Sequence, residues 1–105
     1  MTVRILRRQK AAQDAEDIAD HIAEDSLVAA LRFLENVEST LKDLAAFPGA
    51  GSPFESAHPE LANLRFRRVK ESPNHVIFYV EHTNAIEVVR ILHGARDLDA
   101  ELRRT

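Results

Sequence analysis

Apolar and polar residues change their spacing several times along the chain, and each spacing predicts a different element. The densest apolar material lies in two runs, 76–80 and 85–92, which are separated by a short polar connection. Both runs are rich in β-branched and aromatic residues, which fit a pleated sheet better than a helix. They predict a β-hairpin with a three- to five-residue loop at 81–84, in which Asn84 takes the left-handed conformation.

Two stretches before this hairpin carry apolar residues at steps of three and four, which is typical of amphipathic helices. The first begins near Lys10 and ends near Glu24 or Asp25. The second begins after a cap at Asp25 or Ser26, whose short side chain can accept an amide hydrogen of the first turn. It ends at Pro48, because proline lacks the amide hydrogen that a helix needs. The apolar stripe of the second helix comprises Ala30, Phe33, Leu34, Val37, Leu41, Leu44 and Ala45.

Shorter segments complete the set of predicted elements. Residues 3–7 predict a brief first strand, and residues 64–70 predict a strand with one cationic, solvated face. Glycine and proline residues make 49–59 a loop, and Ser72, Pro73 and Asn74 are predicted to form a turn before the hairpin.

The order strand, helix, helix and three strands predicts one α+β domain over 1–105. Because the helices are joined by one to three residues, they form an antiparallel hairpin that needs a sheet face to cover its apolar stripe. Short links also make the sheet mainly antiparallel, with about four strands in the order β-α-α-β-β-β. Leu98 and Leu102 suit a short C-terminal helix. The sheet face under the helices is predicted to consist of Ile77 and Tyr79, or their neighbours, with Ile86, Val88 and Ile91.

Composition narrows the classes of function. With 14 Lys and Arg against 17 Asp and Glu, the formal charge is −3, whereas domains that hold a nucleic-acid backbone usually carry a basic excess. The absence of cysteine removes disulfides, thiolate metal sites and a cysteine nucleophile. No apolar stretch is long enough to cross a membrane and no secretory signal is present, so a cytoplasmic protein is expected.

Two clusters carry candidate chemistry. Arg65, Arg67 and Arg68 are expected to form a cationic face, and guanidinium groups pair with carboxylates through two hydrogen bonds at once. Asp17 and His21 stand one helical turn apart, as metal ligands can. No third ligand has a suitable spacing, so these two are interpreted as part of a solvated helix face, and no metal is expected.

Four groups of residues carry a resemblance to a known family. They are Asp17, Ile18, His21, Ile22 and Ala23 in the first helix; Ala29, Ala30, Arg32, Phe33 and Leu34 in the second; Leu44, Phe47, Pro48 and Gly51 at its end; and 76–79 with 86–97 in the final hairpin and its exit. In this order and spacing they resemble the ParE branch of the ParE/RelE superfamily, the toxins of bacterial type II toxin–antitoxin systems. Ala19 departs from the pattern, since many relatives carry a tryptophan there.

The resemblance implies a toxin without enzymatic activity that binds DNA gyrase, blocks its strand-passage cycle and stops replication. It implies neutralisation by a cognate antitoxin, ParD-like or another with an acidic tail, whose C-terminal segment wraps the toxin and covers apolar and basic surface. It implies no cofactor and no direct contact with nucleic acid. One of Phe78 and Tyr79 is expected in the core and the other under the antitoxin. The candidate partner-binding residues are Arg65, Arg67, Arg68, Tyr79, Arg90, His93 and Arg96.

An enzymatic alternative comes from the RelE branch, which shares this fold but cleaves ribosome-bound messenger RNA. Such cleavage needs a base, an acid and cations around the scissile phosphate. His93 would be the acid or base and Arg68 with Arg90 the phosphate clamp, with Glu55 or Glu71 as a carboxylate partner. Relatives in that branch tend to be strongly basic and many carry a catalytic tyrosine near the C-terminus. This chain is acidic and its one tyrosine lies within a predicted strand, so binding is favoured. A degenerate toxin that keeps only antitoxin binding is a third interpretation.

The same residues also have structural interpretations. His93, at a strand end, would bond a nearby backbone group or carboxylate. Arg90 would pair with Glu87 or Asp97, and such exposed pairs contribute roughly 0 to 1 kcal/mol. Asp97 would cap the last helical turn.

Overall fold

The computed structural model describes residues 2–95 and 97–104, and its elements follow the predicted order. The helices are α1 (Gln9–Ala23), α2 (Leu27–Ala46) and α3 (Leu98–Arg103), with two short 3-10 segments, η1 (Pro48–Ala50) and η2 (Pro59–Leu61). The strands are β1 (Arg4–Arg7), β2 (Ser52–Pro53), β3 (Leu64–Val69), β4 (Ser72–Glu81) and β5 (Ala85–His93). No helix in this described part of the chain is long and apolar enough to cross a membrane.

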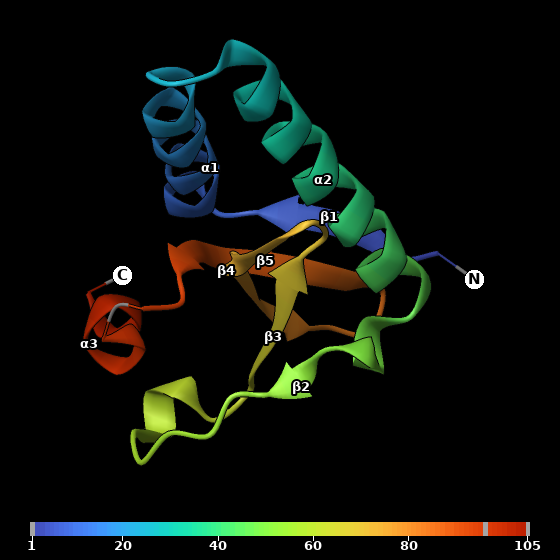
Figure 1. The fold of residues 1–105 in the computed structure, drawn as a ribbon. Coiled ribbons are helices and arrows are strands. Elements are labelled where there is room, and N and C mark those ends of the chain that lie inside the picture. The colour runs from blue at the N-terminus through green and yellow to red at the C-terminus, as the bar shows by residue number, and fades with distance from the viewer. Residues whose placement is uncertain (1, 96, 105) are drawn as a thin grey trace.

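One mixed sheet forms the centre of the domain (Figure 1). Its strand order is β1-β5-β4-β3-β2; β1 runs parallel to β5 and the other neighbours are antiparallel. The predicted α+β class is therefore confirmed. The sheet has five strands rather than about four, because Ser52 and Pro53 leave the expected loop to pair with Phe66 and Arg65 of β3.

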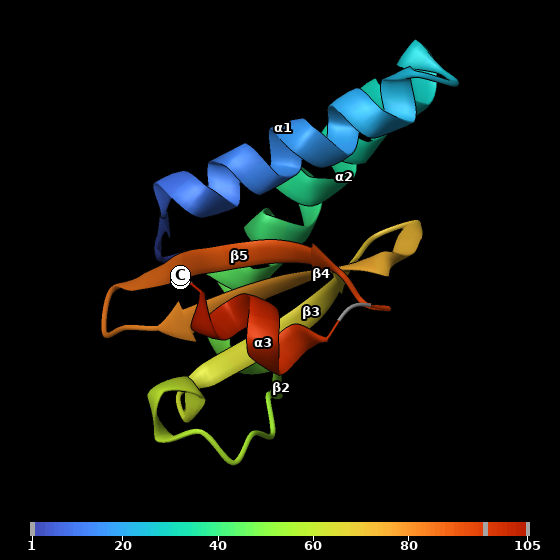
Figure 2. The ribbon, with the colours of Figure 1, turned by 90° about the vertical axis from the view of Figure 1, so that its left-hand side faces the viewer.

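The helical hairpin covers one face of this sheet, while α3 and η2 lie against the other (Figure 2). The first, covered face carries the predicted residues Ile77, Tyr79, Ile86, Val88 and Ile91, which pack with the stripe of α2. The second face carries a separate apolar cluster of Leu61, Leu64, Val76, Phe78, Val89, Leu92 and Leu102. We call these the hairpin face and the open face.

The ends of the helices match the sequence signals. The Ser26 hydroxyl accepts the backbone N–H of Ala29 at 3.1 Å, so Ser26 is the cap of α2. α2 ends two residues before Pro48, and the connection between the two helices is Glu24 to Ser26. The Asp97 carboxylate caps α3 in the same way, accepting from the N–H of Ala100 at 3.2 Å.

Two predicted turns are wrong in detail. Residues 72–74 belong to β4, and the chain reverses one step earlier, where Glu71 has φ 58°. Proline is tolerated at the start of a strand, so Pro73 does not force a turn there. Asn84 is not left-handed, since Glu71 is the one non-glycine residue with positive φ in the described ranges. The carbonyl of Asn84 instead accepts the N–H of Arg4 at 3.1 Å, which ties the hairpin loop to β1.

Candidate functional site

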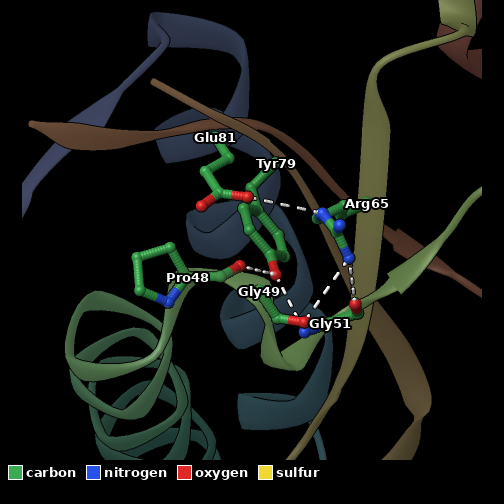
Figure 3. A network of polar contacts seen from close by, with 6 residues as sticks. All are labelled: Pro48, Gly49, Gly51, Arg65, Tyr79 and Glu81. Atoms are coloured by element: carbon green, nitrogen blue, oxygen red, sulfur yellow. Dashed lines mark hydrogen bonds and ion pairs between the residues drawn. The ribbon is translucent and has the colours of Figure 1, made fainter. Parts of the chain in front are cut away.

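Tyr79 lies at the centre of a polar network between β4 and the end of α2 (Figure 3). Its hydroxyl accepts the N–H of Gly51 at 2.9 Å and donates to the carbonyl of Pro48 at 2.7 Å. A Cβ added at Gly51 would lie 2.3 Å from this hydroxyl, so only glycine fits. Burial raises the pKa of Tyr79, although the Gly51 hydrogen bond acts in the opposite direction.

Phe78 and Tyr79 are both fully buried, on opposite faces of β4. Neither ring is exposed for a partner, because η1 covers the tyrosine and the open-face cluster surrounds the phenylalanine. The expectation that one of the two would lie under an antitoxin is therefore not met in the free chain.

Arg65 and Arg67 extend from β3 on the hairpin face and hold the turn around η1. Arg65 donates to the carbonyl of Gly51 at 2.7 Å and lies 3.6 Å from the Glu81 carboxylate, and Arg67 donates to the carbonyl of Ala50 at 3.2 Å. These carbonyls follow the end of a helix, where backbone acceptors lack intrahelical partners. Both arginines thus have a structural role in the turn, and Arg67 remains exposed.

Arg68 is on the other face of the sheet, because successive strand residues point to opposite sides. It pairs with Val76 across the strands and lies beside Phe54 and Phe66 on the open face. The expected cationic face of three arginines is therefore divided: two residues lie on the hairpin face and one on the open face.

Arg90 is buried and held by Asp14 of α1. Its Nε and Nη2 donate to the two carboxylate oxygens at 2.6 and 2.9 Å, and the same carboxylate accepts the N–H of Ile91 at 3.0 Å. A further bond, at 3.2 Å, runs from Nη1 to the carbonyl of Glu101 in α3. The hydrogen bonds that Arg90 donates to Asp14 raise the pKa of Arg90, against the effect of burial.

The predicted pairing of Arg90 with Glu87 or Asp97 is therefore wrong. Arg90 lies opposite Phe78 and Val88 opposite Tyr79, so β5 carries one extra residue at this step. Such a bulge redirects the side chains that follow it, and here it turns Arg90 towards α1.

His93 ends β5 on the hairpin face, opposite His75 of β4. Its Nδ1 accepts the N–H of Ala95 at 3.1 Å, as the structural interpretation predicts. The His75 ring stands edge-on between Phe33 and His93, with centroid distances of 5.0 and 5.4 Å. Burial, and then the neighbouring His93, lower the pKa of His75.

Both histidines line an open groove with Asp17 and His21 of α1. The Asp17 carboxylate accepts from the Gln13 amide at 2.9 Å, and His21 lies 3.6 Å from Glu24. In residues 2–95 and 97–104, no group of three His, Asp or Glu residues is arranged to hold a metal ion.

The residues named for RNA cleavage do not all meet at one place, although Arg90 and His93 line one pocket together with Asp14. His93 faces the helices, Arg68 lies on the open face, and Arg90 is bound by Asp14. Glu55 is exposed in the loop after β2 and Glu71 forms the turn before β4. Arg96 lies outside the described residues.

Sequence reasoning missed Asp14, although the spacing contains a signal for it. Asp14 follows Ala11 by three residues and precedes Ile18 by four, so it falls on the apolar side of α1. A carboxylate in such a position needs a charged partner, and Arg90 is the arginine within the buried run of β5.

Comparison with solved structures gives the same architecture. The chromosomal ParDE toxin–antitoxin system of P. aeruginosa includes a chain with a TM-score of 0.70 and 19% identity, which covers 88% of this chain and 96% of its own length. The RelBE2 toxin–antitoxin complex of Mycobacterium tuberculosis includes a chain with a TM-score of 0.58 and 19% identity, covering 89% of this chain and 99% of its own length. These likenesses establish the fold.

Sequence comparison identifies the family. Among curated proteins, none matches this chain. Residues 5–98 match the family model described as the ParE toxin of the type II toxin–antitoxin system parDE. Since this match spans β1 to the start of α3, the chain belongs to the ParE toxin family.

Proposed function

We propose that this chain is a toxin that binds DNA gyrase and blocks replication without catalysing a reaction. The family match supports a type II toxin, and the resemblance to the ParE branch supports gyrase as the target. An antitoxin of the ParD type, or another with an acidic tail, neutralises it. The two solved neighbours come from toxin–antitoxin systems, which supports such a partner.

The observation that carries the choice between binding and RNA cleavage is the Asp14–Arg90 pair. A phosphate clamp needs a guanidinium whose donors face the substrate. Arg90 directs three of its donors to Asp14 and Glu101 and is 4% exposed, so a phosphate would have to displace a buried carboxylate. The position of Arg68 and His93 on opposite faces of the sheet further supports binding over cleavage.

A supercoiling assay tests the target. Purified toxin at micromolar concentration is expected to inhibit gyrase of the native host, and an equimolar amount of antitoxin is expected to restore activity. The toxin–antitoxin complex, formed before gyrase is added, is the matched control. Full supercoiling activity in the presence of free toxin would contradict the proposal.

Primer extension tests the enzymatic alternative in the same cells. After induction of the toxin, translated messages are expected to show no new ends between codons. New cleavages together with unchanged supercoiling would replace the proposal by a ribosome-dependent ribonuclease. An expressed toxin that neither inhibits gyrase nor arrests growth, yet binds its antitoxin, would be a degenerate member.

A further inference from the structure

Three apolar side chains lie exposed at the start of α2, at the end of the helical hairpin. Leu27 and Val28 are each 66% exposed, and Leu31 is 53% exposed. The hairpin slants away from the sheet towards this end, so the three side chains lie apart from the strands (Figures 1 and 2). Single exposed apolar residues are common on protein surfaces, whereas a contiguous group marks a contact surface. We call this group the hairpin-end patch.

The patch is not part of the face that α2 turns towards the core. The buried residues of the helix begin with Ala30 and Phe33 and recur along its inner side. With 3.6 residues per turn, Val28 lies on the opposite side of the helix, and Leu31 lies between the two sides. Since both remain exposed in the folded domain, contact with a second molecule is what would remove them from water.

Charges of opposite sign lie at the two ends of the patch. Asp25 precedes it, in the connection between the helices, and Arg32 follows it on the exposed side of α2. Within residues 2–95 and 97–104, neither of these side chains forms an ion pair with another residue. Each charge is therefore available to a partner that covers the patch.

The order of acid, apolar patch and base is self-complementary. When two copies pack patch against patch about a two-fold axis, the same surface is used on both and their α2 helices run antiparallel. Each Arg32 then lies next to the Asp25 of the other copy. Two pairs of opposite charge flank one shared apolar cluster, whereas a parallel arrangement would place like charges side by side.

The charges at this end of the hairpin disfavour a lipid surface as the occupant. Asp20, Glu24 and Asp25 are exposed there, and the cytoplasmic surface of a membrane is itself negative. The carboxylates would be repelled before the apolar side chains reached the lipid. A second copy of the chain meets no such barrier, because its Arg32 approaches these carboxylates.

We propose that the hairpin-end patch associates with the same patch of a second copy of this chain, and that Arg32 and Asp25 pair between the two copies. Standard interfaces bury about 800 Å² on each partner, which three side chains and two charged neighbours do not reach. The dimer is therefore weak and forms at micromolar or higher concentration. The inference concerns the free chain and does not depend on gyrase as the target.

Sedimentation equilibrium of the purified full chain at a series of concentrations tests the dimer. Wild type is expected to pass from monomer to dimer as the concentration rises. Leu31→Glu places a charge in the apolar contact, and the substitution occurs twice in a dimer, so the dissociation constant should rise roughly tenfold or more. Phe47→Glu makes the same change in charge at a residue that is 73% exposed just after the other end of α2, and this control should dimerise like wild type.

Reversal of the charges tests the antiparallel arrangement. Arg32→Glu and Asp25→Arg each bring like charges together, so each variant alone should dimerise more weakly than wild type. In a heterodimer of the two variants, both pairs again join opposite charges. An equimolar mixture of the variants should therefore associate more strongly than either variant alone.

Melting temperatures check that the variants, all at exposed positions, keep the fold. A wild-type chain that stays monomeric at every concentration would overturn the proposal, as would equal weakening in Leu31→Glu and Phe47→Glu. Weakening in both charge variants without recovery in their mixture would overturn the pairing of Arg32 with Asp25.

Discussion

The two faces of the sheet are built from the same strands but are closed in different ways. The hairpin face lies under two helices of 15 and 20 residues, and its central side chains are almost completely buried. The open face is covered by η2, its flanking loops and the six residues of α3, and it retains pockets that reach its apolar cluster. The hairpin face is thus the more completely closed of the two, whereas the open face leaves part of its apolar cluster accessible.

Two arginines differ in burial in the same way as the two faces. Arg90 is buried, with its donors used by Asp14 and Glu101, while Arg68 is exposed with one long hydrogen bond. A buried pair fixes geometry, and an exposed guanidinium can be redirected to a ligand at little cost. Substitutions on the two faces should therefore separate stability from binding.

Asp14→Ala is expected to have the largest effect, because it leaves the Arg90 charge buried without its partner. Removing one member of a buried ion pair costs about 3 to 5 kcal/mol in the free energy of unfolding. The N–H of Ile91 also loses its acceptor. Urea denaturation measures the loss. The double variant Asp14→Ala, Arg90→Met is the control and should recover part of it; equal losses in the two would contradict the ion-pair explanation.

Leu41→Ala and Leu98→Ala compare the faces directly. Leu41 is 1% exposed in the hairpin-face core, where truncation of a leucine typically costs about 2 to 5 kcal/mol. Leu98 forms one wall of a pocket on the open face and is already partly in contact with water, so its truncation should cost less than half as much. The two losses in the free energy of unfolding are compared from the denaturant midpoints, provided that both variants keep the wild-type dependence of that free energy on denaturant concentration. Equal losses would show that the open face is packed as tightly as the other.

Much of the fold could be predicted because the helical stripes and the apolar hairpin are local patterns. The face formed by Ile77, Tyr79 and Ile86 followed from alternation along β4 and β5. The turn at Glu71 was missed because proline at 73 is an equally good turn signal, and only the strand pairing decides between the two.

The candidate site was less predictable, since it depends on contacts between distant segments. The alternation of strand side chains between the two sheet faces could have separated Arg68 from Arg65 and Arg67. The helical spacing of Asp14 from its apolar neighbours could have marked it as buried. The direction of Arg90 could not be derived, because a one-residue bulge in β5 sets it. Register irregularities of this kind depend on the packing of the whole sheet and leave no local pattern.

Tyr79→Phe tests how the hairpin face is tied to the end of α2. The substitution keeps the ring but removes the hydroxyl that bonds Gly51 and Pro48. A buried donor or acceptor left without a partner costs about 1 to 3 kcal/mol, so the free energy of unfolding should fall by that amount. The inhibition of gyrase proposed above should persist in this variant when the assay is run well below its melting temperature. An unchanged denaturation midpoint would show that water replaces the hydroxyl without cost.

The smallest expected effect is a pH dependence that originates at His75. Burial and the neighbouring His93 lower its pKa below the ordinary 6.5 in the folded state. As the pH falls below about 6.5, the unfolded chain therefore binds a proton that the folded chain resists. The free energy of unfolding should then decrease with falling pH, while above that pH the stability is retained in full.

His75→Asn removes this contribution, so its stability should fall less steeply than that of wild type between pH 7 and 5.5, measured by urea denaturation at several pH values. His21→Asn, which removes an exposed histidine of the same groove, controls for the loss of a histidine as such. The effect belongs to the hairpin face, because the half-buried His75 ring packs against Phe33 there. If wild type and His75→Asn show the same slope, the ring is solvated in the folded state, and the hairpin face is less closed at this end than at its centre.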